Sequence, residues 1–316
     1  MNVEQLTEQL YNNLSTLLSP ISYKSLLNRA NNLNSFDVIN RLLIEMQSKK
    51  SFEIRTEEDW DMHGRLLNKR AKPIYIILPK YSYRYTNKET GEILVDTDLN
   101  SNEILKALQY GIIEKTEVIE NVYSLPMYDI RDTVSKGDIE YKVTKPNISA
   151  RGLMELFTNI TGATIEKCDE SYYSKSCNTL FINNKSHKEL VISVATGLTS
   201  YYTHNRISNI IAEISEDKLL EYNKQLLNDS IQYAICTLLG VDIDITFDVV
   251  IHTSNNTLIN ILNIVDNIIF EISNYLEFNT EYNFKDAISS INMLRKSEAL
   301  LSILEANDIL NKMKGA

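Results

Sequence analysis

Apolar residues at helical spacing open the chain. Leucine recurs every three or four positions over residues 3–20, which predicts an amphipathic helix that ends at Pro20. A second apolar stripe predicts a helix over residues 35–47, and Ser35 is the side chain expected to cap its first turn. The chain is therefore expected to begin with helices.

Strand-like patterns follow these helices. Residues 73–79 form a short, β-branched run with a proline at each end, and residues 81–85 alternate between tyrosine and polar side chains. The sequence 86–91 contains the residues of a turn and leads into an apolar run at 92–95, so a hairpin is predicted. A further strand is predicted over 118–128. The first half should combine helices with a small, antiparallel sheet.

Helical periodicity dominates the second half. One strand is predicted at 178–183, and helices are predicted at 149–161, 186–203, 205–215, 217–239, 256–277 and 285–313. The 256–277 segment is apolar around most of its circumference, so it is either buried or one half of an oligomer interface. We therefore predict an α+β protein with a sheet-containing domain at 1–147 and a mostly helical domain at 148–316.

Composition narrows the class of protein. The 316 residues contain no apolar run long enough to cross a membrane, and the N-terminus lacks the features of a signal peptide. Cys168, Cys177 and Cys236 are too few for a disulfide scaffold, so we expect reduced thiols and a cytoplasmic protein. The net charge of −10 argues against a protein that coats duplex DNA.

The charge is unevenly distributed along the chain. Residues 1–150 carry 19 basic and 21 acidic side chains, a net charge of −2, whereas residues 151–316 carry 13 and 21, a net charge of −8. Within the first half, the window 65–88 contains seven cations and no acidic residue. The acidity of the whole chain therefore does not exclude a local nucleic-acid-binding face.

Tyrosines interrupt this basic window. On an alternating strand Tyr81, Tyr83 and Tyr85 share one face, where bases stack on the rings while cations hold the phosphates of a single strand. The alternative is that the tyrosines pack against the helices and the cations only face solvent. The candidate binding residues are Trp60, Arg65, Lys69, Arg70, Lys72, Lys80, Tyr81, Tyr83, Arg84 and Tyr85.

The order of segments in the first half of the chain resembles the N-terminal domain of ArdC-type antirestriction proteins. The resemblance covers the helix 35–47, Trp60 and Gly64, the basic cluster, the strand 74–79 and a closing strand at 122–133, about 100 residues in all. It implies a domain that binds single-stranded DNA, in a protein encoded by a plasmid, an integrative element or a phage.

The second half resembles the zinc metallopeptidase-like domain of the same family. Residues 172–183 and Ser186 match its strand, and residues 229–242 match a later helix. The family's His-Glu-x-x-His helix would provide two zinc ligands and a general base, but Thr196, Gly197 and Ser200 occupy those three positions here. Asp229 is the only carboxylate near the third ligand position. The resemblance therefore implies a zincin-like fold without its metal site, and no cofactor.

Other catalytic arrangements have little support in the sequence. His63, His187, His204 and His252 are scattered, and a metal site rebuilt from them and the cysteines has no ligand-pair spacing. Ser200 and His204 lie one turn apart on a predicted helix, but no acidic partner or nucleophile elbow accompanies them. We therefore expect a protein that is not an enzyme.

The leading hypothesis is a non-enzymatic protein of a mobile element that binds single-stranded DNA through its basic, tyrosine-rich hairpin. Its purpose would be protection of incoming DNA from host defence, or replication or transfer of the element, with a host or element-encoded protein as a second partner. The alternative is an interaction module or inhibitor that binds a host protein through its acidic second half. No membrane partner is expected, and the oligomeric state stays open.

Overall fold

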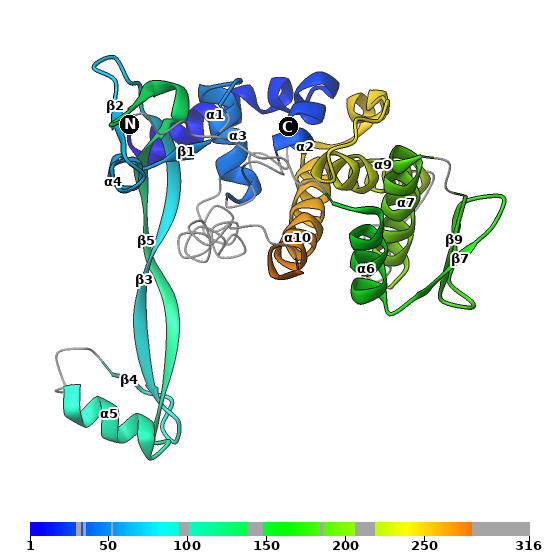
Figure 1. The fold of residues 1–316 in the computed structure, drawn as a ribbon. Coiled ribbons are helices and arrows are strands. Elements are labelled where there is room, and N and C mark those ends of the chain that lie inside the picture. The colour runs from blue at the N-terminus through cyan, green and yellow to red at the C-terminus, as the bar shows by residue number, and fades with distance from the viewer. Residues whose placement is uncertain are drawn as a thin grey trace.

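The protein has a mixed α+β fold. The computed structural model describes residues 1–29, 33, 36–51, 53–94, 101–137, 148–183, 186–205 and 219–279. In Figure 1 a long β-ribbon projects from a body made of helices, and a small sheet lies at the opposite side of the body. No helix within these ranges is long and apolar enough to span a membrane.

The ribbon consists of two long antiparallel strands. Strand β3 (Ile74–Asn87) pairs with β5 (Ile113–Asp129) along its whole length. Short strands extend this pair at either end: β1 (Ile54–Arg55) pairs with β5 at the root and β4 (Ile93–Leu94) pairs with β3 at the tip, giving the order β1-β5-β3-β4. Helix α5 (Ser101–Gln109) lies at the tip (Figure 1). Thirteen residue steps make β3 about 43 Å long.

The hairpin predicted from the sequence, 81–85 with 92–95, corresponds to the pairing of β3 with β4, whereas the long pairing of β3 with β5 was not predicted. The sequence also divided strand β3 at Pro79. That proline lies inside the continuous strand β3. The N–H groups of Tyr75 and Ile77 point away from β5, toward helix side chains, and alternation places the Pro79 nitrogen on the same edge. Its missing N–H therefore removes no bond of the β3–β5 ladder, which is the edge position where proline is tolerated.

Three helices precede the ribbon. Helix α1 (Val3–Leu17) begins with a capping box between Asn2 and Gln5. The single helix expected over 3–20 ends at Leu17, because Pro20 is the first residue of a separate helix, α2 (Pro20–Arg29). Helix α3 (Val38–Gln47) is capped by the side chain of Asp37, whereas Ser35, the cap expected from the sequence, lies outside the described residues.

Several short elements complete the root of the ribbon. Helix α4 (Glu57–Met62) precedes β2 (Arg65–Leu67), which pairs with β6 (Thr133–Ser135). The 3₁₀ turn η1 (Ile130–Asp132) connects β5 to β6. None of these elements is long enough to show a hydrophobic period, which is why the sequence did not predict them.

The second half contains helices and one three-stranded sheet. The helices are α6 (Ala150–Thr161), α7 (His187–Asn205), α9 (Leu219–Leu238) and α10 (Asn255–Asn279), with the 3₁₀ turn η2 (Asp248–His252) before α10. The sheet has the order β7-β9-β8, from β7 (Thr164–Lys167), β8 (Tyr172–Ser174) and β9 (Thr179–Ile182). The helix predicted at 285–313 and nearly all of that predicted at 205–215 lie outside the described residues.

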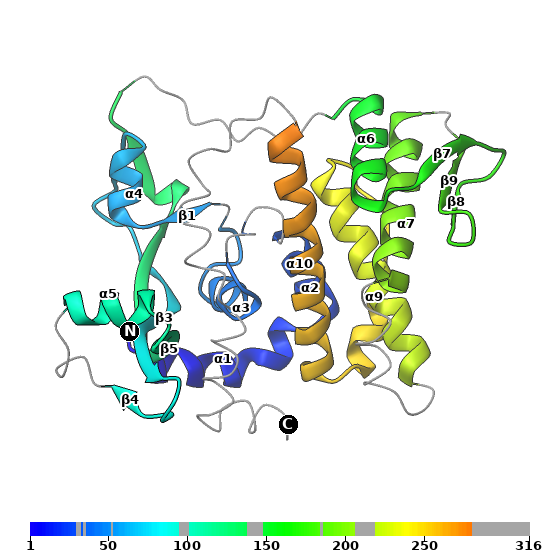
Figure 2. The same cartoon turned by 90° about the horizontal axis from the view of Figure 1, so that it is seen from below.

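One cluster of buried apolar side chains joins the two halves. It includes residues of α1, α2 and α3 as well as α6, α7, α9 and α10. Figure 2 shows α10 between α3 and α9. Leu258, Leu262 and Ile272 of α10 are at most 1% exposed, so burial rather than an oligomer interface explains the apolar circumference of this helix.

Polar contacts cross the same junction. The Tyr23 hydroxyl hydrogen-bonds with the Ser230 hydroxyl at 2.9 Å, the Tyr233 hydroxyl donates to Asn28 at 2.9 Å, and the buried Arg41 forms an ion pair with Asp266 of α10. Helices on both sides of the predicted boundary at residue 147 therefore pack as neighbours.

Candidate nucleic-acid interface

Two amides of α3 fix the root of the ribbon. Asn40 Nδ2 donates to the Ile77 carbonyl at 2.8 Å, and the Ile77 N–H donates back to Asn40 Oδ1 at 2.7 Å. Gln47, seven residues later on the same helix face, makes the same pair of bonds with the backbone of Tyr75, at 2.8 and 2.9 Å. These side chains take the place of a neighbouring strand along the edge of β3. They set the position from which the ribbon leaves the body.

The three predicted tyrosines lie on one side of the projecting part of β3. Tyr83 is 54% exposed, and Tyr81 and Tyr85 are partly buried. Strand β3 keeps its alternation through the register shift between Lys80 and Tyr81, because the extra residue, Glu120, belongs to β5. Successive rings therefore start about 6.8 Å apart along the strand. The row contains one well-exposed ring with a partly covered ring on either side.

A residue that the sequence did not single out completes this face. Lys115 of β5 is paired with Tyr85, and its ammonium lies 3.5 Å from the centroid of the Tyr83 ring. This cation–π contact keeps a positive charge on the aromatic side of the ribbon. Lys115 lies 27 residues outside the basic window, so only the strand register brings it to the tyrosines.

The same pairing places acidic residues beside the basic window. Lys80 forms an ion pair with Glu120 at 2.9 Å, and Glu114 is paired with Thr86, next to Tyr85. Both side chains of the Lys80–Glu120 pair are more than half exposed. The segment 65–88 contains no acidic residue, but strand β5 places acidic side chains beside it.

The remaining predicted cations form two separate groups. Lys69, Arg70 and Lys72 are exposed in the turn between β2 and β3, at the root of the ribbon. Arg84 is exposed ten residues into β3, about 33 Å further along the strand. Within the described part of the chain these four side chains have no ion pair.

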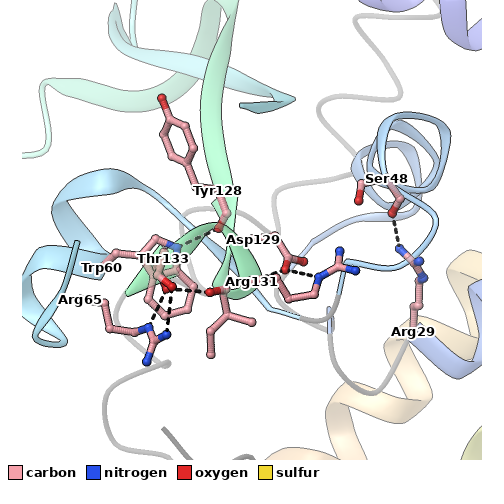
Figure 3. A network of polar contacts seen from close by, with 9 residues as sticks. Arg29, Ser48, Trp60, Arg65, Tyr128, Asp129, Arg131 and Thr133 are labelled. Carbon is pink, nitrogen blue, oxygen red and sulfur yellow. Dashed lines mark hydrogen bonds and ion pairs between the residues drawn. The ribbon is translucent and has the colours of Figure 1, made fainter. Parts of the chain in front are cut away.

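Trp60 corrects one expectation. Its side chain is 0% exposed, and its indole N–H donates to the Tyr128 carbonyl at 2.8 Å (Figure 3). The side chain of Arg55 lies over the ring, 5.6 Å from its centroid. A ring with both its surface and its polar atom engaged has no face to offer a base. Trp60 instead fastens α4 to the end of β5.

Arg65 is also committed to the fold. Its Nε donates to the Thr133 hydroxyl at 2.6 Å, and its Nη2 donates to the Thr133 carbonyl at 3.4 Å, between β2 and β6 (Figure 3). Close by, the buried carboxylate of Asp129 accepts from the backbone N–H and side chain of Arg131, a contact that raises the pKa of Arg131. These contacts hold the root of the ribbon together.

Two of the positions that correspond to the family's zinc motif, Thr196 and Gly197, make contacts that hold the helices together. The Thr196 hydroxyl donates to the Ile192 carbonyl at 2.8 Å and accepts from the Gln232 amide of α9 at 2.9 Å. Gly197 faces the core, where an added Cβ would lie 2.8 Å from the Phe157 ring and 2.9 Å from Leu180. A glutamate at this position would collide with α6, so the residues present do not fit a zinc site with a general base.

The other candidate ligands are dispersed. His63 contacts the Asp59 carbonyl and Arg55, and His204 contacts the Ser200 carbonyl. Partial burial raises the pKa of Asp229. Among the residues that the structure describes, no three His, Cys, Asp or Glu side chains gather closely enough to hold a metal ion.

Comparison with known proteins gives one kind of match. No protein-family model matches the chain, and no curated protein sequence matches it. Among solved structures, the antirestriction ArdC protein from the R388 plasmid matches in both its metal-free and its Mn(II)-bound structure. In each case the match covers 88% of this chain and 98% of the other, with 11% identity and a TM-score of 0.47.

Proposed function

We propose that this protein binds single-stranded DNA through the tyrosine face of the β3–β5 ribbon and is not an enzyme. The observation that carries the proposal is the row Tyr81, Tyr83 and Tyr85 on a projecting strand, with the exposed Tyr83 at its centre. The rings recur about every 6.8 Å, whereas stacked bases of a duplex rise only about 3.4 Å per step. A DNA strand that places one base on each tyrosine ring must therefore be extended, with its bases unstacked from one another. This spacing favours single-stranded over duplex DNA.

Electrostatics support the same assignment with fewer cations than the sequence suggested. Among the candidate binding residues, the exposed cations that have no ion pair within the described structure are Lys69, Arg70 and Lys72 at the root and Arg84 on the ribbon. Four released counterions give a slope of about −2.8 in log K against log salt. Affinity should then fall about 50-fold between about 50 and 200 mM salt.

The second half is proposed to be a zincin-like domain that serves as a scaffold. The hydroxyl and glycine side chains at Thr196, Gly197 and Ser200 offer no imidazole or base, and the first two are engaged in helix packing. The sequence resemblance to ArdC-type proteins supports a role for a mobile element, either in escape from host defence or in replication or transfer of the element.

Fluorescence anisotropy with labelled oligonucleotides tests the binding proposal. Tyr83→Ala removes the most exposed ring of the row Tyr81, Tyr83 and Tyr85, and the loss of one stacked base is expected to weaken binding roughly 5- to 150-fold. Lys69→Glu, Arg70→Glu and Lys72→Glu together should abolish binding at physiological salt. Tyr172→Ala is the matched control, because Tyr172 is a similarly exposed tyrosine, 47%, in the other half of the chain.

Three results would contradict the proposal: preference for duplex DNA, binding that is insensitive to salt, or equal losses in Tyr83→Ala and Tyr172→Ala. If DNA does not bind but a specific host protein is captured through residues 148–316, the alternative interaction module is the better description. Elemental analysis of the purified protein tests the second half separately, since stoichiometric zinc would overturn its assignment as a domain without a metal site.

A further inference from the structure

A groove at the root of the ribbon combines acidic and apolar side chains. It lies between α4 and β2 and has a volume of about 390 Å³. Its lining residues are Glu57, Glu58, Asp61, Met62, Arg65, Leu66 and Leu67. That volume is within the range of pockets that hold a ligand or a few side chains of a partner.

Exposed apolar side chains surround the groove. Met62, at the end of α4, is 75% exposed, and Leu66 on β2 is 48% exposed. Leu66 is paired directly with Val134 of β6, which is 47% exposed. A helix end and two adjacent strands thus present three large apolar residues to solvent, whereas such residues on a monomer are ordinarily scattered singly. Methionine at the margin of such a surface adapts its shape to different apolar partners.

The charge that the groove leaves available is negative. Arg65 donates to the uncharged Thr133 and keeps its positive charge, and Lys136 forms an ion pair with Asp61, so the lining residues and Lys136 together carry three negative and two positive charges. Glu57 and Glu58 are exposed and have no ion pair within the described residues. A phosphate group placed beside Glu57 and Glu58 is repelled by them, whereas a lysine or arginine side chain in the same place is attracted.

We infer that this groove docks a cationic amphipathic segment of a partner protein, with one or two apolar side chains against Met62 and Leu66 and basic side chains beside Glu57 and Glu58. The inference stands independently of DNA binding. Strand β2 ends at Leu67, directly before the basic turn at Lys69, so a protein docked here lies beside the root of the ribbon.

A synthetic peptide provides the probe. A fluorescein-labelled peptide that alternates lysine and leucine is titrated with the full-length protein, and a peptide with glutamate in place of lysine is the charge control. We expect saturable binding of the lysine peptide only, weakened by salt. Met62→Ser with Leu66→Ser should raise the dissociation constant about tenfold or more, because anchoring side chains dominate such contacts. Ile21→Ser with Ile251→Ser, at exposed sites elsewhere, should leave it unchanged.

Reversing the charge of the groove distinguishes binding at this site from a general attraction of the lysine peptide to an acidic protein. Glu57→Lys with Glu58→Lys should lose the lysine peptide and gain the glutamate peptide, and circular dichroism checks that the variant is folded. The inference is overturned if the lysine peptide does not bind, or if it binds all variants equally. It is also overturned if single-stranded DNA rather than the peptide depends on Met62 and Leu66.

Discussion

Asn40 is the position where one side chain should matter most to the ribbon. It is 0% exposed, and its amide bonds to both the N–H and the carbonyl of Ile77 and donates to Asp37 Oδ2 at 2.9 Å. Asn40→Ala leaves two buried backbone groups of Ile77 without partners. Each such group costs about 1–3 kcal/mol, so the variant should lose about 2–6 kcal/mol of unfolding free energy, a large part of the roughly 5–15 kcal/mol of an ordinary domain.

Gln47→Ala is the matched control for this variant. Gln47 makes the equivalent bonds to Tyr75, but it is only half-buried, so water can replace the lost amide. We expect a loss of about 1 kcal/mol there. Urea unfolding followed by circular dichroism, analysed by linear extrapolation, compares the two variants. Equal losses, or a loss below about 1 kcal/mol for Asn40→Ala, would show that Asn40 does not act as a substitute strand.

Replacement by a carboxylate adds a pH dependence. Burial already raises the pKa of Asp37, and Asn40→Asp places a second carboxyl group within reach of it. Because the folded pair then binds a proton more tightly than the unfolded chain, stability is present at low pH and is lost as the pH rises through the raised folded pKa. Asn40→Asp should therefore be most unstable at neutral pH and recover on acidification toward about pH 4, whereas Asn40→Ala, which keeps only the Asp37 carboxyl group at this place, should recover less.

Three further measurements test other parts of the structure. Gly197→Ala should lower stability by about 1–2 kcal/mol in urea unfolding, because overpacking against α6 outweighs a gain of about 1 kcal/mol in helix propensity. Cys177 is exposed and hydrogen bonds lower its pKa, so it should react with iodoacetamide in the native protein. Cys236 is buried and its pKa is raised to about 12, so it should react only on unfolding. Mass spectrometry of the labelled peptides distinguishes the two cysteines. Burial raises the pKa of Tyr23, which bonds to Ser230, so stability should fall as the pH rises above about 10, and Tyr23→Phe should reduce this loss in alkaline denaturation curves.

The long helices and the hairpin could be predicted because their signals are local. An amphipathic helix such as α6 repeats its apolar positions every three or four residues, and the turn before β4 is contained in a few residues. Short elements such as α4 and β2 have no such period and were missed. Pro20 carries two signals, because proline ends a preceding helix and also favours the first position of a new one; the structure shows that it begins α2.

The sequence supplies the residue types: the alternating tyrosines, the cations before β3, and Thr196, Gly197 and Ser200 in place of a zinc motif. Their roles depend on how the chain packs. Strand pairing brings Glu120 to Lys80 and Lys115 to Tyr83, and packing encloses Trp60 while leaving Tyr83 exposed. The physical reason is that side-chain alternation is a local property of a strand, whereas charge compensation and burial depend on residues far away in the chain.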